Sequence, residues 1–251
     1  MDIGSRTVKY VLLNGHKVVD YRIVDTGTDP MGCARSLLNG SKHDSLMATG
    51  YGRHLAREIF ACPILTEIKA FALGAAYYYP GCQTVIDIGG QDCKVIRVDN
   101  GRVEDFEMND RCAAGTGKFL EVMAHTLGYP IEQFGYEALG ARETVSINSM
   151  CTVFAESEVV SLIAQGRLPQ NIALGLHQSI ANRIMTMLGK TGYGDKVVFA
   201  GGVAKNPCLV RLLEHRLGRK LHIPQEPQIV GAIGAALSAN NQRRQDENSA
   251  V

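Results

Sequence analysis

Two stretches of the chain start with the same three residues: Asp2-Ile3-Gly4-Ser5-Arg6-Thr7-Val8-Lys9 and Asp87-Ile88-Gly89-Gly90-Gln91-Asp92-Cys93-Lys94. In each, an Asp, a glycine turn and a Lys lead into an apolar run, which predicts a β-hairpin. Glycines let the backbone approach an anion and direct N–H groups at it. The Asp can face a metal-bound water. Two such hairpins far apart in one chain predict a duplicated domain with a nucleotide bound between the halves.

The composition allows two domains with substantial cores. The chain has 251 residues, of which 45% are hydrophobic and 20% charged, which is typical of a globular protein. A net charge of +1 with no basic run gives no support for nucleic-acid binding. No apolar run reaches the roughly 18–20 residues that span a bilayer. We therefore expect a cytoplasmic protein with no nucleic-acid or membrane partner.

The strand and helix patterns repeat along the chain, with Asn-Gly turns at 14–15 and 100–101. The predicted strands are 2–4, 7–13, 17–24, 45–49, 83–88, 93–98, 102–108 and 196–200. The predicted helices are 29–38, 66–79, 113–127, 131–139, 152–165, 169–189, 206–217 and 228–239. We expect a first domain at 1–79 completed by the last helix, a second domain at 80–227, and a disordered tail at 240–251. Only Met1 precedes Asp2, so either the start is late or the first strand is short.

A third glycine turn follows the predicted strand 196–200. It reads Phe199-Ala200-Gly201-Gly202-Val203-Ala204-Lys205-Asn206 and precedes a predicted helix. Such a turn lets a flat ring or a phosphate lie against the backbone. An ordinary strand-to-helix turn is the alternative. Because two phosphate hairpins precede it, we interpret Gly201 and Gly202 as contacts to the nucleoside.

These hairpins, the glycine pair and a late Gly231-Ala232-Ile233-Gly234 resemble the actin, sugar-kinase and Hsp70 ATPase superfamily. The resemblance implies an α/β fold of two duplicated RNase H-like domains, with Mg²⁺-ATP or its product ADP in the cleft between them. Asp2 and Asp87 would hold Mg²⁺ through water or orient the attacking group. The implied contacts on the phosphate side are Ser5, Arg6, Thr7, Val8, Lys9, Gln91 and Asp92.

Two of the seven cysteines differ from the others in their surroundings. Cys112 and Cys151 each lie immediately before a predicted helix, at 113–127 and 152–165. Helix N-termini favour a thiolate or an anionic sulfur cluster. Two thiols are too few for a four-thiolate cluster, but a two-fold dimer would supply the other two. The alternative is that both are buried residues at helix starts.

The segments around these cysteines, residues 109–118 and 149–158, resemble the signatures of the 2-hydroxyacyl-CoA dehydratase activators of the BadF-type ATPase family, as do 49–53 and 87–92. The resemblance runs from Asp2 to about Leu237. It implies a homodimer bridged by one [4Fe–4S] cluster on Cys112 and Cys151. The protein would use ATP to pass an electron from ferredoxin or flavodoxin to a CoA-ester dehydratase or reductase. It also implies that Gly115, Thr116, Gly117 and Gln228 approach the nucleotide.

Several alternatives stay open. A small-molecule kinase of the same superfamily would need an acceptor pocket with a base, which nothing in the sequence marks, and would not use the two cysteines. Arg6 stands where the family usually has a small hydroxyl residue, which would alter phosphate contacts. Glu156 and Glu158 could be catalytic, but acids early in a helix are favoured electrostatically, so we interpret them as capping or surface residues.

Overall fold

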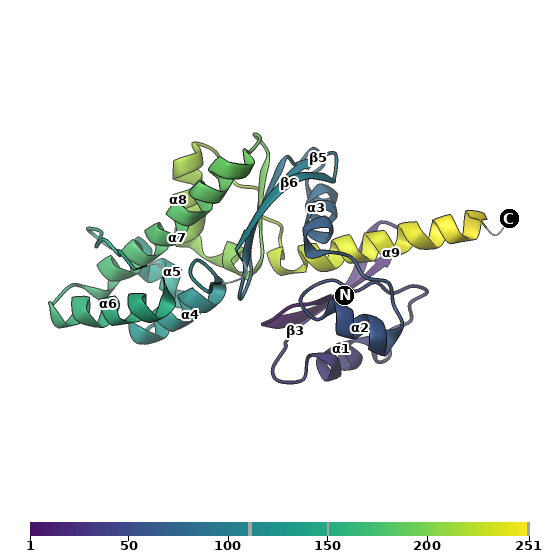
Figure 1. The fold of residues 1–251 in the computed structure, drawn as a ribbon, viewed down its shortest axis with the longest axis horizontal. Helices are drawn as coiled ribbons and strands as arrows, with labels where there is room; N and C mark the ends of the chain where they lie inside the picture. Colours follow the sequence, from purple (N-terminus) through teal and green to yellow (C-terminus); the bar gives the residue numbers. More distant parts are fainter. Residues whose placement is uncertain (110–111, 150, 250–251) are drawn as a thin grey trace.

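The computed structural model describes residues 1–109, 112–149 and 151–249, and it consists of two lobes (Figure 1). One lobe has a three-stranded sheet in the order β1-β2-β3, and the other a four-stranded sheet in the order β6-β5-β4-β7. Asp110, Arg111 and Met150, which belong to the two cysteine segments, lie outside the described residues. Within the described ranges, no helix is both long and apolar enough to cross a membrane.

The first lobe is built on an antiparallel meander, and its strands are β1 (Asp2–Ile3), β2 (Thr7–Asn14) and β3 (Lys17–Asp25). Two helices, α1 (Pro30–Leu38) and α2 (Arg53–Phe60), pack on one face through Ala34 and Ala56. The predicted strand 45–49 is reduced to isolated bridges, among them Asp2 with Thr49. The sequence analysis missed α2, although Leu55, Ala56, Ile59 and Phe60 recur at helical spacing; the helix is only eight residues long and Ala56 is its one buried residue.

The second lobe repeats the hairpin and adds a parallel strand. Its strands are β4 (Thr84–Ile88), β5 (Cys93–Asp99), β6 (Arg102–Asn109) and β7 (Val197–Ala200). Asp87 pairs with Lys94 across β4 and β5, as Asp2 pairs with Lys9 across β1 and β2. The two sequence repeats therefore form hairpins of the same register. β4 and β7 are buried at every position, as expected for strands covered on both faces.

Helices surround the second sheet. The main core of this lobe is formed by α4 (Gly117–Thr126), α5 (Ile131–Leu139), α6 (Thr152–Ala164), α7 (Pro169–Thr191) and α8 (Pro207–Leu217). The short 3-10 turns Gly202–Lys205 and Pro227–Ile229 follow β7 and precede the last helix. In Figure 1, α6 lies at the outer end of an arm that extends away from the sheet.

Two helices connect the lobes at a close crossing. α3 (Glu67–Tyr78) packs on the second sheet through Phe71 and Ala75, whereas α9 (Val230–Ser249) packs on the first sheet through Ile233. A Cβ added at Gly74 would lie 1.9 Å from the Val230 carbonyl oxygen. The helices therefore meet backbone to backbone. The domain boundary at 79/80 stays a prediction, because α3 contacts both the second sheet and α9.

Two predictions about helix ends were wrong. The tail at 240–251 was predicted to be disordered, but α9 continues as a helix to Ser249. The buried first half of this helix nucleates it, so that adding further residues costs little. Residues 242–245 are good helix formers. Asn240 also donates to the Gly15 carbonyl at 3.2 Å. α4 was predicted from residue 113 but begins at Gly117, because residues 113–116 form a turn in which Gly115 has φ +84°.

Candidate active site

A cavity of about 500 Å³ lies where the two hairpins face each other. The first lobe contributes the β1–β2 turn and Tyr51; the second contributes the β4–β5 turn, α5 and the turn after β7. Glu67, at the start of α3, also lines it. Most of the residues predicted from the sequence line this cavity: Asp2, Ser5, Arg6, Thr7, Lys9, Asp87, Gln91, Asp92, Gly117, Gly201, Gly202 and Gln228.

Three predicted nucleotide contacts do not line the cavity. Val8 is fully buried in the core of the first lobe, because side chains alternate along β2 and those of Thr7 and Lys9 take the cavity side. Thr116 is buried, and its hydroxyl donates to the Ala113 carbonyl at 2.6 Å. Gly115 faces the Arg183 side chain. Within that signature, Gly117 is the residue that lines the cavity.

Each hairpin pairs its Asp with its Lys. In the first, Lys9 Nζ lies 3.1 Å from Asp2 Oδ2, and Asp2 is buried. In the second, Lys94 is only 2% exposed. Its Nζ lies 3.2 Å from Asp87 Oδ2, 2.7 Å from Asp92 Oδ1 and 3.0 Å from Glu67 Oε2. Lys94 therefore joins the floor of the cavity to the first turn of α3.

The charged groups of this buried cluster shift one another's pKa values. Burial would lower the pKa of Lys94, but the carboxylates of Asp87, Glu67 and Asp92 outweigh it and raise the pKa above its ordinary value. Burial raises the pKa of Asp87 to about 7, although Lys94 opposes that shift. Lys94 and Glu67 were not predicted as site residues. The sequence could have indicated Lys94 as a site residue, because Lys94 repeats Lys9 in the second hairpin. No local sequence feature indicated Glu67.

The residues present suit a divalent cation beside a nucleotide. Asp87 Oδ1 is buried and has no hydrogen-bond partner among the described residues, so an acceptor is left for a metal-bound water. The described lining includes seven carboxylates (Asp2, Asp25, Glu67, Asp87, Asp92, Glu121 and Glu132) but four cations (Arg6, Lys9, Lys94 and Lys205). A polyphosphate entering this negative surface needs added positive charge, which Mg²⁺ would supply.

The turn after β7 forms the other end of the cavity. Gly201 has φ +83°, and a Cβ there would lie 2.4 Å from the Ile88 carbonyl oxygen, so only glycine fits. Lys205 Nζ lies 2.9 Å from Glu226 Oε2 and 2.8 Å from Gln228 Oε1. Asn206 caps α8, and its amide donates to His177 Nε2 at 2.9 Å. The two glycines, Gly201 and Gly202, bring backbone without a side chain to this end of the cavity, which suits contact with a planar base.

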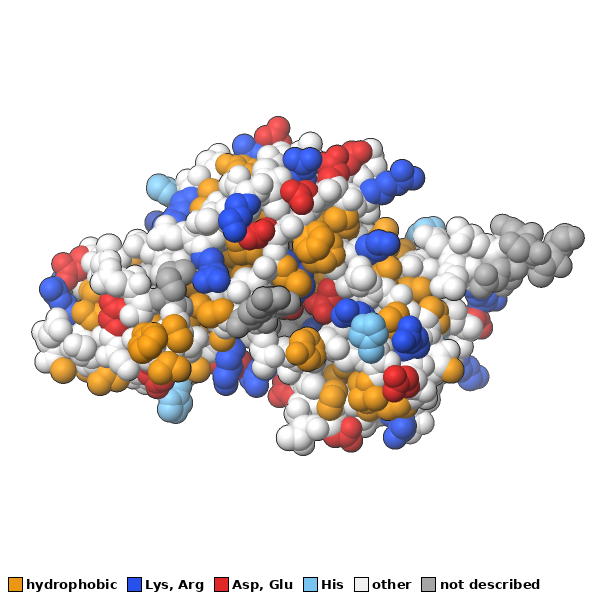
Figure 2. Space-filling view, in the orientation of Figure 1, with side chains coloured by type: hydrophobic (Ala, Val, Ile, Leu, Met, Phe, Trp, Pro, Cys, Tyr) orange, Lys and Arg blue, Asp and Glu red, His pale blue; other side chains and the backbone are white. Residues whose placement is uncertain are grey.

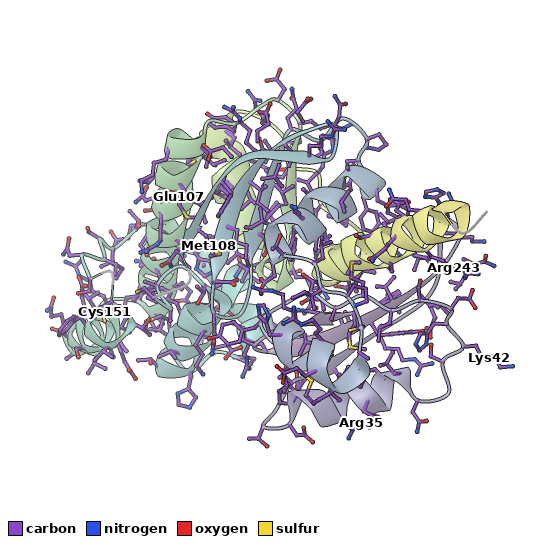
Figure 3. The ribbon with its side chains drawn as sticks, turned by 45° about the vertical axis from the view of Figure 1, so that its right-hand side comes forward. Arg35, Lys42, Glu107, Met108, Cys151 and Arg243 are labelled. Atoms are coloured by element: carbon purple, nitrogen blue, oxygen red, sulfur yellow. The ribbon has the colours of Figure 1, made fainter. Side chains whose placement is uncertain are left out.

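The two singled-out cysteines lie away from the cavity. Cys151 is the exposed N-cap of α6, with no side-chain capping bond to the described residues, and Figure 3 labels it on the arm opposite Arg243. Cys112 is partly exposed. The prediction that Cys112 immediately precedes a helix was wrong, because the turn at 113–116 separates it from α4. Its carbonyl accepts from Asn109 Nδ2 at 2.8 Å.

The remaining cysteines are mostly structural. Cys62, Cys82, Cys93 and Cys208 are buried, and burial raises their thiol pKa values, to about 12 for Cys208. The Cys33 thiol is within 3.5 Å of the Thr26 carbonyl oxygen.

In the described part of the chain, no group of three or more His, Cys, Asp or Glu side chains is arranged to hold a metal ion.

A fold of two RNase H-like lobes with a nucleotide-sized cavity between phosphate hairpins defines the actin-like ATPases. The computed structure matches the crystal structure of the Acidaminococcus fermentans (R)-2-hydroxyglutaryl-CoA dehydratase component A with a TM-score of 0.91 and 38% identity, covering 97% of each chain. It matches the ADPNP-bound activator of the 2-hydroxyisocaproyl-CoA dehydratase from Clostridium difficile with a TM-score of 0.89 and 36% identity, covering 99% of this chain and 96% of that one.

Sequence comparison narrows the class to one family. The chain is 42% identical over 250 residues to the (R)-2-hydroxyglutaryl-CoA dehydratase activating ATPase of Acidaminococcus fermentans, covering 95% of each chain. Residues 1–239 match the BadF/BadG/BcrA/BcrD ATPase family, and the chain belongs to that family. The resemblance and the two-domain fold inferred from the sequence are therefore confirmed.

Proposed function

We propose that this protein hydrolyses ATP to pass single electrons to a CoA-ester dehydratase or reductase and so activates it. The observation that carries the proposal is that one chain combines a cavity between paired phosphate hairpins with two surface cysteines on separate segments. The relatives named as dehydratase activators support the same reading. A kinase would have no use for the cysteines.

At the nucleotide site, Asp2 and Asp87 would hold Mg²⁺ through water, and Mg²⁺ would neutralise charge on the phosphates as they separate. The amides of both hairpin turns, with Ser5, Thr7 and Gln91, would hold the phosphates. Arg6 lines the cavity and is half-exposed, so its guanidinium can reach a phosphate. Gly201, Gly202 and Gln228 would lie against the nucleoside.

At the cysteine segments, Cys112 and Cys151 would hold half of a [4Fe–4S] cluster, and the same residues of a second copy would complete it on the two-fold axis. The cluster would supply the one-electron carrier. Cys151 is exposed and Cys112 is partly exposed, which is compatible with such sharing. α6 exposes Val153, Phe154, Val160 and Ile163 beside Cys151, and Figure 2 shows apolar side chains on this arm. An apolar face of this kind supports contact with a second copy.

The two sites have different tasks. Reduced ferredoxin or flavodoxin would supply the electron, and the CoA-ester enzyme would receive it. Nucleotide binding between the lobes would change their relative position, and the arm that carries Cys151 belongs to the second lobe. Hydrolysis would then make the transfer irreversible.

The test is the iron stoichiometry of protein purified without oxygen. The wild type should be a brown dimer with about four iron atoms per dimer. Cys112→Ser and Cys151→Ser should each remove the cluster, because one substitution deletes two of the four ligands. ATP hydrolysis should partly survive, since the cavity is built from other residues. A full cluster in a monomer, or in the double variant, would contradict the proposal, and stoichiometric phosphorylation of a metabolite would favour the kinase.

A further inference from the structure

The carboxylate of Glu158, in the second turn of α6, holds the backbone that leads to Cys151. Glu158 Oε1 and Oε2 accept from the backbone N–H of Asn148 at 3.0 and 3.2 Å, and Oε2 accepts from that of Ser149 at 2.8 Å. The Asn148 side-chain amide donates to Oε1 at 3.3 Å. One side chain thus satisfies two successive backbone donors in a segment that has no regular secondary structure.

These contacts lie on the N-terminal side of Cys151. Cys151 and Glu158 are separated by about two helical turns, so both lie on the same side of α6. On the C-terminal side, the Cys151 carbonyl accepts the first bond of the helix, from Ala155 N at 2.8 Å. On the N-terminal side, the Glu158 carboxylate holds residues 148 and 149. Described residues on both sides of Cys151 are therefore bonded to α6.

Farther back along the segment, contacts come from α7. Val145 N donates to the Asn171 carbonyl at 3.4 Å, and a Cβ on Gly175 would lie 1.9 Å from the Val145 carbonyl oxygen. These contacts fix residue 145 against the body of the lobe, but Cys151 lies beyond them on the arm. The Glu158 contacts thus tie residues 148 and 149 to α6.

The hydrogen bonds to Glu158 are charge-assisted. Partial burial would raise the pKa of Glu158, but the hydrogen bonds from Asn148 and Ser149 outweigh it and lower the pKa below its ordinary value. The carboxylate is therefore ionised at neutral pH. Bonds from N–H groups to an ionised acceptor are shorter and stronger than neutral ones.

We propose that Glu158 is a positioning residue that fixes the backbone before Cys151 and so holds its thiolate in place for the cluster. The proposal rests on the proposed function, because it takes Cys151 as a cluster ligand. Glu158 itself does not bind iron in this assignment. The sequence analysis assigned it a capping or surface role, and the structure gives that role a specific target.

The experiment compares Glu158→Gln with Glu156→Gln. Both changes remove one negative charge from α6, but the Glu156 carboxylate faces Thr126 Oγ1 of α4 at 3.5 Å instead of residues 148 and 149. A third variant, Glu158→Asp, keeps the charge and shortens the side chain. The first readout is hydrogen exchange at the amides of residues 148 and 149 in cluster-free protein. The second is the rate of iron loss to a chelator from protein loaded with iron and sulfide.

Glu158→Gln and Glu158→Asp should each exchange these two amides at least about fivefold faster than the wild type, because charge-assisted bonds are lost. Both should lose iron several-fold faster, while Glu156→Gln should match the wild type in both readouts. Unchanged exchange in Glu158→Gln, or equal effects in Glu156→Gln, would overturn the inference. A wild type that binds no cluster would overturn the proposed function and the ligand role of Cys151, and the exchange data would still decide whether Glu158 holds the segment.

Discussion

Among the ion pairs of the described residues, Lys94 has the most carboxylate partners. Its side chain is 2% exposed, and its ammonium group contacts the carboxylates of Asp87, Asp92 and Glu67. Lys94→Met should lower the free energy of unfolding by about 3–5 kcal/mol, because removing one partner of a buried ion pair leaves uncompensated charge. Urea denaturation without Mg²⁺ measures this.

Lys9→Met is the matched control for that change. Lys9 occupies the same hairpin position, but its side chain is 14% exposed and, among the described residues, pairs with Asp2 alone. The loss of stability should be clearly smaller. Equal losses in the two variants would show that the three-carboxylate contact adds nothing to the ordinary hairpin pair.

Asp87 provides the test of the nucleotide site itself. Its Oδ1 atom is buried without a hydrogen-bond partner among the described residues, and the residue lines the cavity. Asp87→Ala should abolish ATP hydrolysis, since a carboxylate at a metal site contributes several kcal/mol of transition-state stabilisation. The dimer and its iron content should be unchanged. Phosphate release assays measure the effect, and wild-type turnover in this variant would refute the assignment of Asp87.

His177 gives the stability a specific pH dependence. The ring is fully buried: Nδ1 donates to the Ala173 carbonyl at 2.7 Å, and Nε2 accepts from the Asn206 amide at 2.9 Å. Burial lowers the pKa of His177 from its ordinary value of 6.5 to about 4. The unfolded chain therefore binds the proton first as the pH falls. Stability from this residue is complete above pH 6.5 and is lost as the pH falls through about 4.

That loss amounts to about 3 kcal/mol, from the size of the pKa shift. His177→Gln has no ring to protonate, so the difference in unfolding free energy between the wild type and this variant should shrink between pH 7.5 and 4.5. Urea denaturation at several pH values measures it. A difference that stays constant with pH would show that His177 does not titrate in this way.

At the scale of elements, the crossing of α3 and α9 depends on two glycines. A Cβ at Gly74 would lie 1.9 Å from the Val230 carbonyl oxygen, and one at Gly234 would lie 1.8 Å from the Ala70 carbonyl oxygen. Gly74→Ala should force the helices apart and lower the free energy of unfolding by about 1–3 kcal/mol. Thermal or urea unfolding measures this.

Gly189 in α7 is the control, because a Cβ there has no described atom within 4 Å outside its own helix backbone and neighbours. Gly189→Ala should be neutral or stabilising by up to about 1 kcal/mol, which is the difference in helix propensity. If both changes destabilise the protein equally, the effect comes from helix backbone conformation and not from the crossing.

The helices and strands differ in how far the sequence predicts them. The hairpins were predictable because a short local motif, Asp-Ile-Gly, sets each turn and its register. The helical tail after residue 240 was not, because its stability comes from the buried part of α9 and from contacts such as Asn240 with Gly15, far away in the chain. For the same reason, Glu67 was not predicted as a site residue, and Glu158 was assigned only a capping or surface role. The partners of both side chains are set by tertiary packing.

In the whole molecule, an ion pair between two residues that line the cavity joins the lobes. Arg6 in the first hairpin lies 2.9 Å from Glu121 in α4 of the second lobe, with side chains 52% and 29% exposed. An exposed pair of this kind contributes about 0–1 kcal/mol, so it does not hold the lobes together by itself. Arg6 nevertheless stays close to where the phosphates would lie.

Two single substitutions separate a role in closing the lobes from a role in binding phosphate. Arg6→Gln should weaken binding of a non-hydrolysable ATP analogue with Mg²⁺ by about tenfold, as expected for the loss of a charge-assisted phosphate contact. Glu121→Gln removes the pair but leaves the guanidinium, so it should bind the analogue at least as tightly as the wild type. Both variants should lose less than about 1 kcal/mol of stability. Titration calorimetry decides between the two roles: equal weakening in both variants would mean that the pair acts by joining the lobes, because only that function is lost in both.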